Sequence, residues 1–319
     1  MKAIARENAV AFFFYISMAV LAAGCASGPA AAQRSYTERK AVEAGNAGFD
    51  ALDKEDYGRA LENFTLALQL DRSVDNRTGE MRDLINIGRV HIALNDVKGA
   101  EKHLSEAVRL AADEKEEAYL SAALASLAKV SYMEGDSQKA LAGIERSIEI
   151  DARTGARSGS KLNLKARIQI DSGKLEDAME VLKQAYEWNS SVDNRQEVAN
   201  SLRLMALISE ARGKLDEAKK FYDEAYDNDT AIGDSARISD DLESMADIEL
   251  LSGRTEKAAF LYERSFIVSL NAGLLDDSLA RLYKIIDIYK RVGDIDKVVY
   301  YEKIKDGVIA RKERVNSGR

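Results

Sequence analysis

Cysteine, histidine and proline are almost missing from this sequence. Its 319 residues include one cysteine, two histidines and one proline. A single thiol cannot close an internal disulfide, and Cys25 with only His91 and His103 cannot build a Cys/His zinc site. Pro29 precedes all of the helical pattern described below, so no later proline interrupts a helix. The composition therefore excludes a disulfide framework and a zinc-dependent fold.

The same scarcity argues against catalysis. His91 falls on the inward face of a predicted helix, where a packed side chain is expected, and His103 has no cysteine or histidine partner nearby in the sequence. The 54 acidic residues make chance carboxylate pairs unavoidable, so such pairs carry no weight. No glycine-rich phosphate loop follows a predicted strand. We therefore predict no catalytic residue, no metal site and no cofactor, and a protein that is not an enzyme.

Charge of one sign is in mild excess. The formal net charge is −8, and the charged residues are spread through the chain. Such a balance favours solubility and argues against general binding to nucleic acid.

The N-terminal residues have the pattern of a targeting segment. Lys2 and Arg6 form a short positive region, and an uncharged, mostly apolar stretch then runs from Ala9 to Gly24. As a helix this stretch would span roughly 24 Å, short of the ~30 Å hydrocarbon core of a bilayer. Its length is typical of the apolar region of a signal peptide. Small residues, "AAG" at 22–24, directly precede Cys25.

This stretch resembles a bacterial lipobox, although Ala22 stands where that motif usually has leucine. The resemblance implies that residues 1–24 are a lipoprotein signal peptide and that Cys25 becomes the lipidated first residue. Ala26, in a place where an aspartate commonly retains lipoproteins at the inner membrane, implies the outer membrane, facing the periplasm. Residues 25–36 would then be a tether before a first helix near Thr37. The alternative is an ordinary secretory signal with an incidental cysteine.

One motif recurs through the remainder of the chain. Compare "GDSQKALAGIERSIEID" (135–151), "GKLEDAMEVLKQAYEWN" (173–189) and "GKLDEAKKFYDEAYDND" (213–229). Each begins with glycine and has alanine five residues later. These alanines are Ala60, Ala100, Ala140, Ala178, Ala218 and Ala258, at spacings of 40, 40, 38, 40 and 40 residues. Apolar residues recur at three and four rather than at two, which predicts helices throughout. A fixed period of this length predicts a solenoid of helix–turn–helix units.

The glycines fall where the first helix of a unit must end in a left-handed turn. Asn95 takes that place in the second unit, and Glu55 breaks the rule in the first. A small residue lies twelve positions before the alanine of each second helix, at Gly48, Gly88, Ala128, Ala166, Ala206 and Ala246. Small residues at these places let neighbouring helices approach closely.

This pattern resembles the tetratricopeptide repeat over about residues 37–312, in seven copies that we number repeats one to seven. The resemblance implies an all-α, right-handed solenoid of about fourteen helices. The seventh copy, with Ile286 and Val298 where small residues recur, reads as a capping repeat, and residues 313–319 form a basic tail. Repeat four is the expected weak point, because its spacing is short and Gly155 and Gly159 mark its junction.

Tetratricopeptide solenoids usually bind partners on the concave side, lined by the first helix of each repeat. Helical spacing predicts that this side presents a basic strip followed by an acidic step: Arg82, Arg89, Lys129, Arg167 and Arg203, then Asp240, Glu243 and Asp247. Such a surface would suit an extended peptide of mixed charge. The alternative is that these residues are simply solvated helix faces.

Together these features predict a membrane-anchored interaction scaffold in the bacterial cell envelope, of the kind that assists assembly of a pilus, secretion or outer-membrane complex. Its partners would be other envelope proteins or their peptide segments, with the membrane reached through the N-terminal lipid. The alternative is a peptide-binding receptor without catalytic activity.

Overall fold

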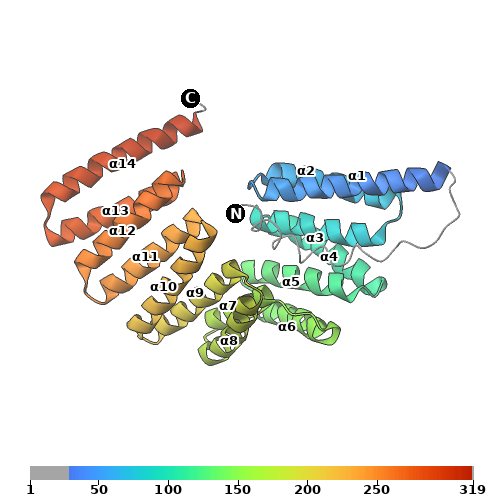
Figure 1. The fold of residues 1–319 in the computed structure, drawn as a ribbon, viewed down its shortest axis with the longest axis horizontal. Helices are drawn as coiled ribbons and strands as arrows, with labels where there is room; N and C mark the ends of the chain where they lie inside the picture. The colour runs from blue at the N-terminus through green and yellow to red at the C-terminus, as the bar shows by residue number, and fades with distance from the viewer. Residues whose placement is uncertain (1–28, 318–319) are drawn as a thin grey trace. The chain divides into compact units, whose positions relative to one another are not determined.

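A computed structural model describes residues 29–317, and in this range the chain is an all-α solenoid of fourteen helices without strands (Figure 1). The helices are α1 (Pro29–Leu52), α2 (Tyr57–Ser73), α3 (Arg77–Ala93), α4 (Val97–Asp113), α5 (Glu117–Met133), α6 (Ser137–Thr154), α7 (Gly159–Asp171), α8 (Leu175–Ser191), α9 (Arg195–Ala211), α10 (Leu215–Ile232), α11 (Ser235–Leu251), α12 (Thr255–Asn271), α13 (Leu275–Val292) and α14 (Ile295–Asn316). Two consecutive helices make each repeat, so the prediction of the fold and of its helix count is confirmed. The predicted signal peptide, residues 1–24, and Cys25 lie outside the described residues.

The two end helices are longer than expected. α1 begins at Pro29 rather than near Thr37, so most of the predicted tether is helical, and α14 continues to Asn316 into the predicted tail. Proline is well tolerated in the first turn of a helix, and the alanines that follow are the strongest helix formers. The first helix therefore starts before Thr37, where the sequence pattern alone predicts it.

The turn within each repeat contains the residue with left-handed backbone conformation that the sequence predicts. The residue at this position has a positive φ in all seven repeats: Glu55, Asn95, Gly135, Gly173, Gly213, Gly253 and Gly293. Even Glu55 adopts it, with φ of 56°. Directly after this residue, side chains such as Asp96 and Asp136 accept a hydrogen bond from a backbone N–H of the next helix and begin it.

Small residues set how closely the two helices of a repeat pack. Ala100 and Leu104 of α4 are fully buried against α3. A Cβ on Gly88 would lie 2.4 Å from Cγ of Leu104, so this place requires glycine. The same close approach explains why alanine recurs at the corresponding places along the chain.

The chain divides into two compact parts, Met1–Asp83 and Leu84–Arg319. In the first part α1 and α2 pack through Phe49 and Phe64, whose rings meet edge to face with centroids 5.1 Å apart. In the second part the helix pairs follow one another along an arc (Figure 1).

Repeat four has the shortest helix of the chain's described part, α7, with 13 residues. Residues 155–158 separate it from α6, and Gly155 has a φ of 75°. No helix in residues 29–317 is both long and apolar enough to cross a membrane.

Candidate functional site

The first helices of repeats two to seven carry one equivalent position directly after their small residue. We call these positions the inner row: Arg89, Lys129, Arg167, Leu207, Asp247 and Asp287. The row therefore starts with three cations, passes one leucine and ends with two carboxylates. All six residues belong to the part Leu84–Arg319.

The first two cations of the inner row have no partner. Arg89 and Lys129 are exposed, and neither makes an ion pair or hydrogen bond with any residue in the described range. The protein around Arg89 displaces water and lowers the pKa of its guanidinium. Because the side chain is still open to solvent, the group stays charged at neutral pH. These two cations are available to an incoming anion.

The positive charge of Lys161, which is outside the inner row, interacts with that of Arg89. Lys161 of α7 donates hydrogen bonds to Ser121 Oγ at 2.6 Å and to Asp151 at 2.7 Å, and its side chain is 15% exposed. Burial lowers its pKa, and the charge of Arg89 lowers it further, against the raising effect of Asp151. Of the three cations Arg89, Lys129 and Lys161, only Lys161 is paired with a carboxylate among the described residues.

Arg167, the third cation of the inner row, contacts one carboxylate and one hydroxyl group but stays partly exposed. It lies 3.5 Å from Asp171 one turn along α7 and donates to the Tyr132 hydroxyl at 3.2 Å. Tyr132 in turn donates to Asp171. Since the Arg167 side chain remains 46% exposed, an ion pair of this kind contributes little and can be exchanged for a ligand.

The carboxylates of α11 on the inner surface are paired with cations of the next first helix. Glu243 lies 2.7 Å from Lys284 and 3.0 Å from Arg281, both on the next first helix, α13. Asp247 is 3.3 Å from Lys284, and Asp240 is 2.6 Å from Arg281. The predicted acidic step therefore exists as residues on α11, but every one of its carboxylates is already paired.

Two of the predicted strip residues lie between helices. Arg203 is 17% exposed and bridges Asp229 of its own repeat and Asp241 of the next, at 2.6 Å from Asp241. Arg82 is 29% exposed and lies 2.9 Å from both Asp71 and Asp83. Both arginines are committed to buried carboxylates, so the predicted strip narrows to Arg89, Lys129 and Arg167.

The two histidines do meet, against the expectation for His103. Their rings stack with centroids 5.2 Å apart, and His91 Nδ1 lies 2.8 Å from Asp96. The positions are twelve apart in sequence, and the turn between α3 and α4 brings them together. In residues 29–317 no group of three or more His, Cys, Asp or Glu side chains could hold a metal ion.

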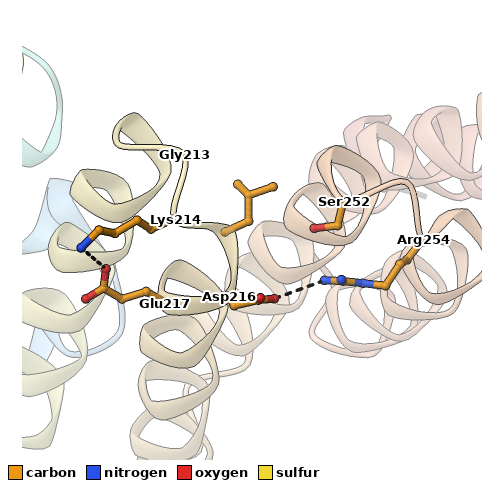
Figure 2. A pocket seen from close by; sticks show the side chains of 7 residues that line it. Gly213, Lys214, Asp216, Glu217, Ser252 and Arg254 are labelled. Atoms are coloured by element: carbon orange, nitrogen blue, oxygen red, sulfur yellow. Dashed lines mark ion pairs between the residues drawn. The ribbon is translucent and has the colours of Figure 1, made fainter.

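Two recesses lie on the surface of repeats four to six. Figure 2 shows one between the turn before α10 and the turn before α12, where Lys214 pairs with Glu217 at 3.3 Å and Arg254 with Asp216 at 3.9 Å. The other is lined by side chains of α8, α9 and α10, among them Met179, Met205 and Phe221. The charges of the first recess pair with each other, and the second is lined by charged side chains, Lys183, Glu187, Arg212 and Glu217, as well as by apolar ones.

The buried aspartates that pair with Arg82, Lys161 and Arg203 were not predicted from the sequence. Asp71, Asp151 and Asp229 all lie eleven residues after the alanine of a second helix, a place that is alanine in repeat two. A carboxylate at an otherwise buried repeat position was the available signal, since a buried charge needs a partner.

Comparison with known proteins agrees with the repeat. Family models described as "Tetratricopeptide repeat" match residues 197–266 and 162–191, and one described as "Anaphase-promoting complex subunit 5" matches residues 47–150. No curated protein sequence matches this chain.

Solved structures share the fold. Aspartyl phosphate phosphatase F from Bacillus subtilis is 15% identical, with 86% of this chain and 72% of that chain covered and a TM-score of 0.62. The quorum sensor NprR from B. thuringiensis is 17% identical, with 83% and 79% covered and a TM-score of 0.56. A Rap protein complexed with Competence and Sporulation Factor is 13% identical, with 85% and 74% covered and a TM-score of 0.60. At these identities the likeness concerns the fold alone.

Proposed function

We propose that this chain is a lipid-anchored tetratricopeptide adaptor of the bacterial cell envelope, and that its inner surface in repeats two to four binds an acidic segment of a protein partner. The observation that carries the binding part is the state of Arg89 and Lys129. Both are exposed cations on adjacent first helices, and neither has a carboxylate partner among residues 29–317. An extended acidic peptide laid across α3, α5 and α7 would supply that partner.

Electrostatics sets how strongly such a surface can act. Each exposed pair contributes about 1 kcal/mol or less, so recognition would be cumulative and sensitive to salt. Clustered positive charge also raises the local concentration of an acidic segment and speeds its encounter. This suits an adaptor that captures a partner reversibly.

Capture from native membranes tests the binding part. Cross-linking followed by affinity purification should recover a partner with the wild-type chain and lose it with Arg89→Glu, Lys129→Glu and Arg167→Glu combined. The helical content and melting temperature should stay near wild type, because none of the three side chains is buried. Undiminished capture by the folded triple variant would move the binding surface elsewhere, to the outer helices or the basic C-terminal end.

The anchor is tested separately. The proposal that Cys25 carries the lipid rests on the apolar run, the small residues before it and its isolation in the sequence. Cys25→Ser should release the protein from the membrane fraction or leave the precursor uncut. A mature wild-type chain that begins at any residue other than 25 would refute this part and leave the binding part standing.

A peptide-sensing receptor is the second candidate. Two structures with this fold are described as a quorum sensor and as a Rap protein with a bound signalling factor. Here the same inner cations would hold a free peptide rather than a segment of an envelope protein. Recovery of a short secreted peptide, in place of a membrane-associated protein, in the cross-linking experiment would favour the receptor.

A further inference from the structure

Six joints link the seven repeats, and two equivalent positions can be followed from joint to joint. One is the residue eleven places after the alanine of the second helix, and the other lies on the next first helix, five places before its small residue. We call the two residues a joint pair. The pairs are Asp71 with Asp83, Ala111 with Ala123, Asp151 with Lys161, Asn189 with Ser201, Asp229 with Asp241, and Ser269 with Arg281. Packing demands no particular charge here, because one of the six joints uses two alanines.

Most joint pairs carry no surplus negative charge. Asp151 meets Lys161 at 2.7 Å, so that joint is balanced. Asn189 donates to Ser201 Oγ at 3.4 Å, and Arg281 donates to Ser265 Oγ at 2.6 Å. None of these joints places two carboxylates side by side.

The joint between repeats five and six is different. Asp229 and Asp241 are both fully buried, and Arg203 alone bridges them. Arg203 also donates to Asn200 Oδ1 at 3.2 Å. Two buried carboxylates beside one guanidinium leave one negative charge too many, and burial of an unbalanced charge is costly. A proton shared by the pair removes this surplus.

The same arrangement occurs at the joint between repeats one and two. The side chains of Asp71 and Asp83 are at most 1% exposed, and both contact Arg82, which lies 2.9 Å from each. Asn76 donates a further hydrogen bond to Asp71 at 2.9 Å, while Asp83 Oδ2 meets no donor. Two buried aspartates therefore recur at equivalent places in the two joints, whereas the arginine comes from the helix after the joint (Arg82 of α3) in one and from the first helix before it (Arg203 of α9) in the other.

The geometry points to a proton-operated joint: at the contact of repeats five and six, Asp229 and Asp241 together hold one proton, and its loss loosens the packing of α11 against α9 and α10. The balanced joint between repeats three and four would not respond. The singly protonated pair, whose one negative charge Arg203 balances, keeps repeats six and seven packed at mildly acidic pH, and the pair with two negative charges releases them as the pH rises.

The groups around the pair support this direction. Burial raises the pKa of Asp241 to about 6, against the opposing effect of Arg203, and Asp240 beside it adds to the rise. Arg237 of α11 opposes it, but Arg237 is itself engaged by Asn200 and by Asp234. Tyr222 of α10 is a neutral neighbour that donates to Glu210, and burial raises its pKa. From α13, Arg281 acts on Asp240 rather than on the pair.

Hydrogen exchange on the full chain, measured at pH 5 and pH 8 and corrected for intrinsic exchange, tests the joint. The protection of the α11 amides should fall on the order of tenfold between these values, since each unit of pKa shift is a factor of ten in the folding equilibrium. The α7 amides, at the balanced joint, should change less than about twofold. Equal protection of α11 at both pH values would overturn the proposal without any variant.

Two substitutions and a control complete the test. Asp241→Asn should abolish the pH dependence of α11, and Asp229→Asn should do the same, so that one of them is informative if the other fails to fold. Asp247→Asn, on the same helix but outside the joint, should leave the wild-type pH dependence in place. A tenfold fall that persists in a folded Asp241→Asn or Asp229→Asn variant would contradict the assignment, as would an equal fall in α7.

Discussion

Repeats two to four and repeats six and seven are built alike but use their inner surfaces in opposite ways. In repeats two and three the inner row places Arg89 and Lys129 in solvent, and no carboxylate of residues 29–317 pairs with them. In repeat six, Glu243 and Asp247 face Lys284 of repeat seven, at 2.7 and 3.3 Å. The exposed cations of the first region are unpaired among the described residues, whereas the carboxylates of the second region pair with cations of the next repeat.

This difference teaches how a repeat protein separates stability from binding. Small and apolar residues recur at the same places because packing demands them in every repeat. The positions between them are free to differ, and ion pairs to the next repeat convert some of them into structural contacts. Charge alone therefore does not mark a binding surface, and the absence of a partner is the more informative property.

The largest expected effect separates two arginines that look alike in sequence. Arg203→Ala should lower the free energy of unfolding by about 3–5 kcal/mol, because it leaves Asp229 and Asp241 buried without a cation. Arg89→Ala, its matched control, should change it by less than about 0.5 kcal/mol. Urea unfolding followed by circular dichroism measures both. Comparable losses in the two variants would show that the open and closed regions are not distinct.

The next effect concerns Asp83, whose pKa is raised to about 7 by burial despite Arg82. The folded state keeps a proton that the unfolded chain releases at about pH 4, so this stability is complete below pH 4 and is lost as the pH rises through 7. The loss amounts to at most about 4 kcal/mol. Asp83→Asn should flatten this part of the stability profile between pH 4 and 8. A slope that remains as steep in the variant would mean that other groups carry it.

A smaller effect contrasts repeat four with the capping repeat. A Cβ on Gly159 would lie 1.8 Å from Asn189 Oδ1, whereas a Cβ on Gly307 meets nothing within 4 Å. Gly159→Ala should therefore destabilise the protein by about 2 kcal/mol through overpacking. Gly307→Ala should stabilise it by up to about 1 kcal/mol through helix propensity. Thermal unfolding gives both signs, and a stabilised Gly159→Ala would refute the close contact.

The smallest effect is kinetic. Residues 155–158 lie between α6 and α7 with Gly155 at a positive φ, so limited proteolysis should cut first within 152–161. Early cleavage elsewhere, with this segment protected, would show that repeat four is not the weak point between the open and the closed regions.

The sequence was sufficient for the fold because the fold is local and repeated. A period near 40 residues, glycine at the turns and alanine at the close contacts predicted the helix pairs and their left-handed turns. The first helix starts earlier than the repeat pattern predicts because "PAAA" is a strong helix start that lies outside the repeat.

The candidate site could be predicted only in part, because the partner of each charge is distant in sequence. Arg203 meets Asp241, 38 residues away, and Arg281 meets Asp240, 41 residues away. Helical spacing placed Arg89 and Arg203 in one strip, although one is free and the other bridges two buried carboxylates. Which rotamer each long side chain adopts, and toward which neighbour, depends on three-dimensional packing that a single helix pattern does not contain.

The central claim is that the open cations of repeats two and three form the binding surface, and one affinity comparison tests it most directly. A fluorescent peptide of alternating glutamate and glycine can be titrated by anisotropy at low salt against two double variants. Arg89→Glu with Lys129→Glu reverses the inner row, and Lys102→Glu with Lys220→Glu reverses two exposed lysines on the even-numbered helices. Both variants change the net charge equally. The account predicts at least a tenfold loss of affinity for the inner variant and less than a twofold loss for the outer one. Equal losses in the two variants would show that the peptide senses only net charge, and would contradict it.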